Sequence, residues 1–512
     1  MVVKVDDLTG QVVSCSSGGV CMAYIAVVIT VVVCFSLILI IRALRFVPAP
    51  ADAAHLPVAP VDIDTAVRHL SEAVTYRTIA YPDEDKVDWD EFDRFHKWLA
   101  DAYPAVTCSL ERETVSRASL IYKWTGRDPA LMPFAMLAHM DVVPVEESTL
   151  ENWTHPPFAG VVDNDTVWGR GANDMKNQLV AIFEAIETLL NESFTPERDV
   201  YICIGHNEEV QIGDRSGARA MARLLQQRGV RLEFVFDEGG AILENPPFGL
   251  SKPVAMIGLA EKGYTDFCVS VLDAGGHSAE PPRNTALGKL AMVLAAIEKR
   301  PMKQRLISPV TLTFDALGRY MGFTMRLVLA NLWLFKPLAL RSLAANKQTN
   351  SMTRTTIAAT MAEASPASNI LPQKASATLN VRILPGETSG DVKSHIERVA
   401  SKTAVEIELD MLRGSPAVGE RVSAWAYQAI LRYLPAVREG VIPAPYLVTG
   451  ATDSREYEPV ADEIYRFYPF ILSESELDAM HATDERIRRE SLAGALRFNY
   501  HFIKEASSGS RG

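Results

Sequence analysis

The sequence has few cysteines and no concentrated run of positive charge. Six cysteines are scattered over 512 residues without a Cys-x-x-Cys pair, so the pattern suggests neither a zinc knuckle nor a dense disulfide framework. Lys and Arg number 51 against 63 Asp and Glu, which gives a formal net charge of −12. No lysine- or arginine-rich tract is present, and we therefore expect no nucleic-acid partner.

The length and composition indicate a globular protein with more than one core. Hydrophobic residues make up 48% of the chain and charged residues 22%, which is ordinary for a folded protein. Single cores stop growing well below 512 residues. The sequence therefore predicts two or more domains.

One long uncharged stretch, residues 23–41, stands apart from the rest of the chain. Its 19 residues are enough to cross a bilayer as a helix, so we expect a membrane anchor preceded by an N-terminal tail at 1–22. Residues 42–61 contain several prolines and predict a semi-rigid linker. A cleaved signal peptide is the alternative, because Ala49-Pro50-Ala51 leaves cleavage open.

The orientation of this anchor is not decided by the residues around it. Arg42 and Arg45 follow the apolar run, and the positive-inside rule would then place the rest of the chain in the cytosol. Three glycosylation sequons, at Asn152, Asn164 and Asn191, have meaning only in a secretory lumen.

Beyond residue 62, helix-like and strand-like segments alternate. Buried strands are predicted at 133–138, 200–204 and 232–236, with helices at 175–190 and 215–228. This alternation predicts an α/β fold with a mostly parallel sheet covered by helices. Such sheets bind ligands beyond the carboxyl ends of their strands.

The pattern changes near residue 261 to a β-α-β-β-α-β order. We predict strands and helices, in chain order, at 264–272, 284–299, 354–361, 375–384, 391–400 and 405–409. This order is ferredoxin-like. We therefore predict a second domain at 261–412, inserted between parts of a catalytic domain at 62–260 and 413–505.

Residues 325–340 are strongly apolar but interrupted by Arg326, Asn331 and Lys336. The segment is too short and too charged to span a membrane well. We expect a packed helix here, with a lipid-binding or dimer surface as the alternative.

Polar residues cluster at the ends of the predicted strands. His139 and Asp141 follow the first strand, and residues two apart in an extended segment share a face. A carboxylate beside an imidazole fixes the tautomer of a histidine that binds metal. For this pair alone, a loop histidine hydrogen-bonded to a nearby carboxylate is the simpler explanation.

Further carboxylates follow the other predicted strands or precede helices. Asp174 precedes a long helix and could be an ordinary N-cap. The adjacent Glu208 and Glu209 would repel each other unless a cation neutralised them. Asp237-Glu238-Gly239-Gly240, whose glycines allow a sharp turn, and His481 complete the set. Histidine and carboxylate donors without a thiolate suit zinc or a similar divalent ion.

These segments resemble the co-catalytic di-zinc peptidases and amidohydrolases, a family that includes aminoacylase, carboxypeptidase S and N-fatty-acyl-amino-acid synthase/hydrolase. The resemblance extends from about residue 62 to 505 and is nearest to carboxypeptidase S and N-fatty-acyl-amino-acid synthase/hydrolase. It rests on the motifs AHMDVVP, WGRGANDMKN, GHNEE, FDEGG, GGHSAEPP, SNILP, NVRILPG, GATDSR and MHATDE. Asn207, where some relatives have aspartate, and Met175 touch no expected ligand.

The resemblance implies two zinc ions per subunit, and it assigns roles to particular residues. Asp174 would bridge the ions, with the remaining ligands being His139 and Asp237 for one and Glu209 and His481 for the other. It also implies roles outside the metal ligands: Asp141 orients His139, Glu208 is the general base, His277 serves a partner subunit's site, and Asn369, Arg382 and Thr452 hold the substrate.

The resulting prediction is a membrane-tethered homodimeric hydrolase of small peptides or N-acyl amino acids with a free carboxylate. The resemblance favours a catalytic domain in the lumen of the vacuole or secretory pathway, or outside the cell. Alternatives are a dipeptidase and an N-fatty-acyl amino acid synthase/hydrolase working in both directions. A catalytically silent binding protein would have lost a ligand or the base, and here all are present.

Overall fold

The main sheet of the protein is mixed and mostly parallel. The computed structural model describes residues 17–48, 56–210, 215–246, 249–420 and 424–508. Strands β3, β6, β7 and β16 pair in parallel at the centre of the sheet, as predicted. The eight strands lie in the order β1 (Glu111–Val115), β2 (Ser119–Trp124), β6 (Val200–Gly205), β3 (Phe134–His139), β7 (Leu232–Leu243), β16 (Ala461–Leu472), β8 (Val254–Glu261) and β15 (Ile442–Val448).

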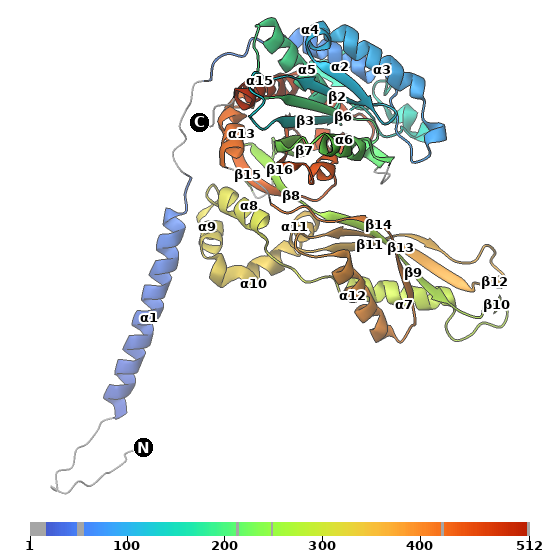
Figure 1. The fold of residues 1–512 in the computed structure, drawn as a ribbon. Coiled ribbons are helices and arrows are strands. Elements are labelled where there is room, and N and C mark those ends of the chain that lie inside the picture. Colours follow the sequence, from blue (N-terminus) through green and yellow to red (C-terminus); the bar gives the residue numbers. More distant parts are fainter. Residues whose placement is uncertain (1–16, 49–55, 211–214, 247–248, 421–423, 509–512) are drawn as a thin grey trace, which may run out of the picture.

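Helices cover both faces of this sheet, which is why its central strands read as continuous apolar runs. Along β3, Met136 and Ala138 pack into one core, whereas Ala135 and Leu137 pack into another beneath α6 (Gly217–Gln227). Figure 1 shows the two layers. The helices of the first layer are α2 (Ile63–Val74), α3 (Trp89–Ala102), α4 (Pro104–Ser109), α5 (Lys176–Asn191), α13 (Ala424–Val437) and α15 (Arg489–Ser507).

A second, antiparallel sheet follows from residue 263. Its strand order is β11 (Thr356–Glu363), β13 (Lys374–Ile383), β9 (Gly263–Leu272) and β14 (Glu408–Ser415). Helices α7 (Ala286–Lys299) and α12 (Ser389–Ala400) pack on one face, against alternate residues of β13. The six elements occur in the predicted order, although the last strand begins three residues later and is longer than predicted. The domain ranges 62–260, 261–412 and 413–505 remain predictions.

Smaller elements extend from both sheets. The two-stranded ribbon of β10 (Gly276–His277) and β12 (Ile370–Leu371) forms the tip of the second sheet farthest from α1 (Figure 1). Beside the first sheet lie β4 (Val161–Asp163), β5 (Thr166–Trp168), β17 (Arg486–Arg488) and α14 (Glu474–Ala479).

The apolar N-terminal segment forms α1 (Ser17–Arg45), which extends away from the body (Figure 1). By length and composition, Tyr24–Arg45 could cross a membrane, with a mean hydropathy of 3.1. The helix is longer than predicted, since it begins inside the predicted tail and continues into the predicted linker. Residues 1–16 and 49–55, which include the candidate cleavage site, lie outside the described residues.

The prediction of one packed helix at 325–340 is wrong. The chain forms α9 (Phe323–Ala330) and α10 (Leu332–Leu343), which are bent by 114° at Asn331 and lie between α8 (Ser308–Gly318) and α11 (Lys347–Thr353). The Asn331 amide Nδ2 donates to the carbonyl of Leu327 at 2.9 Å and to that of Leu39 at 3.1 Å. Asparagine side chains compete with the backbone in this way and disfavour helix interiors.

The predicted sharp turn at Gly239-Gly240 is also absent, because β7 continues to Leu243. The pairing with β16 shifts register between Asp237 and Gly240, which is a β-bulge. At Gly240 a Cβ atom would lie 1.7 Å from the carbonyl oxygen of Met256. This glycine therefore permits close approach of the neighbouring strand.

Candidate metal centre

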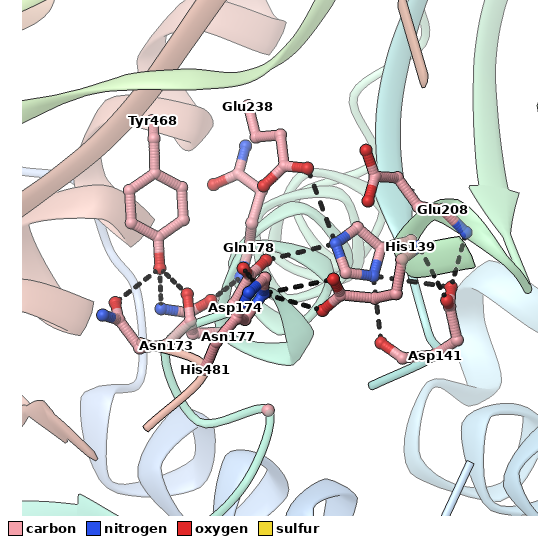
Figure 2. Close-up of polar contacts among 12 residues, drawn as sticks. His139, Asp141, Asn173, Asp174, Asn177, Gln178, Glu208, Glu238, Tyr468 and His481 are labelled. Carbon is pink, nitrogen blue, oxygen red and sulfur yellow. Dashed lines mark hydrogen bonds and ion pairs between the residues drawn. The ribbon is translucent and has the colours of Figure 1, made fainter. Parts of the chain in front are cut away.

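His139 ends β3 at the carboxyl edge of the main sheet and is buried. Its Nδ1 lies 3.0 Å from the carbonyl oxygen of Asp141 and 3.5 Å from the Asp141 carboxylate. The Asp141 carboxylate also accepts the backbone N–H groups of Glu208 and Glu209, both at 3.2 Å. Asp141 thus fixes the His139 ring, largely through its backbone, and positions the turn that carries both glutamates (Figure 2).

Asp174 lies between the two histidines of the centre. Its Oδ1 is 3.2 Å from His139 Nε2, and its Oδ2 is 2.9 Å from His481 Nε2. Burial alone would raise the pKa of Asp174, but the two imidazoles hold it below the usual value. The Asp174 carboxylate thus faces the two imidazoles, each with one of its oxygens.

The turn before α5 is held by Glu485, the last residue of the MHATDE motif, for which the sequence indicated no role. Its Oε1 accepts the backbone N–H groups of Gly171 at 2.9 Å, Asn173 at 2.9 Å and Asp174 at 3.0 Å. Glu485 is fully buried and also pairs with Arg170. Nothing local in the sequence marks this contact, because more than three hundred residues separate the partners.

Glu208 and Glu209 follow β6 and differ in their surroundings. Glu209 Oε2 lies 3.1 Å from His481 Nε2. Burial and the Asp174 carboxylate raise the pKa of Glu209 to about 7. Glu208 is buried, and its pKa is raised well above the usual value by burial and by Glu238.

Glu238 and Asp237 differ in their contacts beside His139. Glu238 Oε1 lies 3.5 Å from His139 Nε2 (Figure 2), whereas Asp237 Oδ2 accepts the backbone N–H of Ser454 at 2.7 Å. The different contacts of the two adjacent carboxylates occur beside the bulge in β7. The assignment of Asp237 to the His139 group stays a prediction, and this contact adds Glu238 as a second candidate.

The donor atoms suit divalent cations. Ligand atoms lie within 4.8 Å of one another in two overlapping groups, His139 with Glu208 and Glu238, and His139 with Asp174 and Glu209. Burial and Asp174 raise the pKa of Glu238 to about 8, and burial also raises the pKa of Glu208 and Glu209, so these three carboxylates bind protons more readily than a free glutamate does. Metal binding displaces such protons, and nitrogen and oxygen donors without sulfur fit zinc.

A cavity of about 550 Å³ opens beside Glu209 and is lined by two further predicted residues, Arg382 and Thr452. The Arg382 guanidinium lies 4.8 Å from the centroid of the Tyr264 ring. Thr452 Oγ1 donates to the buried carboxylate of Glu261 at 3.0 Å. The cavity wall is rich in guanidinium groups, those of Arg215, Arg219, Arg382, Arg413 and Arg455.

Two predicted site residues lie away from this cluster. His277 is exposed on the β10–β12 ribbon, and the N–H of Ser278 donates to the carbonyl of Asn369 at 3.2 Å. His277 and Asn369 are thus neighbours at the tip of the second sheet, and that tip lies apart from the carboxyl edge of the main sheet (Figure 1).

Comparison with known proteins bears on this centre. Residues 135–505 match the peptidase family M20/M25/M40. The chain belongs to this family. It is 36% identical to the probable carboxypeptidase S-like 2 of Dictyostelium discoideum, over 86% of this chain and 85% of that protein. It is also 34% identical to the N-fatty-acyl-amino acid synthase/hydrolase PM20D1 of Mus musculus, over 86% of this chain and 87% of that protein.

Solved structures of the family share the fold. The M20 family metallo-carboxypeptidase Sso-CP2 from Sulfolobus solfataricus superposes with a TM-score of 0.61 at 18% identity, covering 86% of this chain and 98% of that one. Human carnosine dipeptidase 1 gives a TM-score of 0.59 at 15% identity, covering 87% and 96%. The resemblance found in the sequence motifs is confirmed, and the M20 membership supports hydrolase activity.

Proposed function

We propose that this M20 protein is a membrane-tethered, di-zinc hydrolase that cleaves the amide bond of a small peptide or N-acyl amino acid with a free carboxylate. The observation that carries the proposal is the position of Asp174 between His139 and His481, with Glu208 at the same cluster. Each of these side chains comes from a different strand end or turn. A structural role alone would not require so many buried carboxylates together.

In this proposal Asp174 would be a ligand shared by two ions. His139 would hold one ion together with Asp237, which the family resemblance implies, or with Glu238, which its contact with His139 favours, and Glu209 and His481 would hold the other. When bound, the zinc ions would polarise the scissile carbonyl and lower the pKa of water.

Glu208 would move the proton. Its carboxylate belongs to the same group of donor atoms as His139 and Glu238, while its backbone is fixed by Asp141. From this position Glu208 takes a proton from the attacking water and passes it to the leaving amine. Burial keeps the group shielded from bulk solvent.

The cavity supports a substrate with a free carboxylate. Arg382 brings positive charge to the wall that also contains Glu209, whereas Arg455 in the same wall is paired with Glu261. Guanidinium groups bind carboxylates well. The relatives named above include both carboxypeptidase S-like and N-fatty-acyl-amino acid enzymes. A dipeptidase, or synthesis and hydrolysis of N-fatty-acyl amino acids, remains the alternative activity of the same site.

One experiment tests metal and substrate together. Full-length protein purified in detergent should contain about two divalent ions per chain, and chelation should abolish hydrolysis as they are removed. A panel of blocked dipeptides and long-chain N-acyl amino acids would then identify the substrate class. Full hydrolysis by metal-free protein would contradict the mechanism.

We also propose a lumenal or extracellular catalytic domain and a homodimer. The three sequon asparagines, Asn152, Asn164 and Asn191, are exposed, as glycan attachment requires. In sealed microsomes, added protease should leave the catalytic domain intact. Glycosidase treatment of lysed microsomes should increase the electrophoretic mobility of the protein. Digestion in intact vesicles would instead support the orientation favoured by Arg42 and Arg45.

A further inference from the structure

The helices α9 and α10 expose an apolar surface. The exposed fractions are 43% for Phe323, 44% for Met325, 60% for Trp333 and 59% for Leu338. Residues 323–343 contain no aspartate or glutamate, and their charged residues are all basic: Arg326, Lys336 and Arg341. Apolar surface combined with basic side chains is typical of helices that lie in the interface of a bilayer.

These helices are attached to the C-terminal part of α1. The Arg42 guanidinium donates to the carbonyl of Ala330 from Nε at 3.1 Å and from Nη2 at 3.0 Å. One turn away, Asn331 Nδ2 donates to the carbonyl of Leu39. The bend between α9 and α10 is therefore fixed against the apolar helix.

The contact continues into the apolar part of α1. The rings of Phe35 and Trp333 meet edge to face, with 6.1 Å between centroids. Phe35 precedes Arg42 by seven residues, which at a rise of 1.5 Å per residue is about 10 Å along the helix. Interfacial helices bury their apolar faces about 5–10 Å deep. If Arg42 marks the polar boundary, Trp333 lies near the depth expected for such a helix.

We propose that α9 and α10 are a second membrane-contacting element, which lies in the surface of the bilayer that α1 crosses. The inference rests on the proposed membrane tether. A lipid surface is favoured over a second copy of the chain because the exposed face is continuous with the candidate span and carries only basic charge. Two attachments, one spanning and one interfacial, would hold the catalytic body in a set orientation above the membrane.

Tryptophan fluorescence tests this placement. Of the seven tryptophans, Trp333 is exposed, and the other six are buried or half-buried. The full chain would be inserted into nanodiscs of phosphatidylcholine and phosphatidylserine, with and without bromine on the acyl chains. We expect brominated lipid to quench part of the emission, and Trp333→Phe to lose most of that quenching.

Two further variants control for folding and for position. Trp89→Phe removes a half-buried tryptophan of α3 and should retain the quenching. Adding Leu338→Trp to Trp333→Phe should restore quenching, since Leu338 is also exposed on α10.

The outcomes distinguish a failure of the proposed membrane tether from a failure of the proposed contact between α9–α10 and the bilayer. Protein that fails to enter the discs would overturn the tether and the inference with it. If the protein enters the discs but brominated lipid does not quench the Trp333 emission, the inference alone is overturned. In that case, an emission shift between discs with one copy and discs with two would show that the face covers a second chain.

Discussion

At the scale of single residues, Glu208 and Glu209 are adjacent but have different contacts. We predict that Glu208→Gln retains the metal and loses about 10²–10⁴-fold in turnover, because it removes the proton shuttle and keeps the other contacts. Glu209→Gln should lose metal, since Glu209 pairs with His481 at 3.1 Å. Metal analysis beside steady-state kinetics distinguishes the two variants. Metal loss in Glu208→Gln instead would reverse the assignment.

A second prediction concerns the neighbouring pair in β7. Glu238→Gln should weaken metal binding by more than about 100-fold, because removing even a hydrogen-bond partner of a metal ligand lowers the metal affinity by about 10–100-fold. Asp237→Asn should change it less, since an asparagine oxygen can still accept the Ser454 N–H. Competition with a chelating dye measures both affinities. A larger loss in Asp237→Asn would identify Asp237 as the ligand.

At the scale of elements, the turn before α5 depends on a distant residue. Glu485→Ala leaves three backbone N–H groups and the buried Arg170 without their acceptor. We expect the free energy of unfolding to fall by about 3–5 kcal/mol, as when one partner of a buried ion pair is removed. Urea unfolding of chelator-treated protein measures this change.

A matched control for Glu485→Ala lies on the surface. Glu113 pairs with Arg228 at 2.8 Å, with both side chains nearly half exposed. Glu113→Ala should therefore change stability by less than about 1 kcal/mol. Equal effects of the two substitutions would show that Glu485 does not hold the turn.

The elements also show what the sequence alone could predict. Strand ends and apolar periodicity predicted that His139 and Glu209 would meet, because parallel strands gather their carboxyl ends at one edge. Asp174 precedes α5 and was grouped with them as a ligand through the family resemblance. The different contacts of Asp237 and Glu238 occur beside a bulge, and bulges arise from pairing with other strands. The role of Glu485 depended on tertiary contacts that no local pattern encodes.

At the scale of the whole molecule, the position of His277 leads to a prediction about assembly. It is exposed on the β10–β12 ribbon, away from the metal cluster of its own chain (Figure 1). If a partner's site uses it, mixing His277→Ala chains with Glu208→Gln chains should restore activity that neither has alone. A mixed dimer contains one site with an intact Glu208 and a His277 from the other chain.

The control for this experiment is a mixture in which both substitutions lie in one chain. His277→Ala/Glu208→Gln chains mixed with wild-type chains should yield no intact site in a mixed dimer, because each site then lacks one of the two groups. Pulldown with two different tags confirms that mixed dimers form. Absence of recovery in those dimers would assign His277 to its own chain or to no catalytic role.

The order in which the ligands occur along the chain affects its biosynthesis. His139 leaves the ribosome first, whereas His481 and Glu485 emerge only after more than 300 further residues have been synthesised. A nascent chain that lacks them has neither the second imidazole at Asp174 nor the carboxylate that holds the turn before α5. The centre can therefore close only after Glu485 has been synthesised, and a chain terminated before that residue cannot form it.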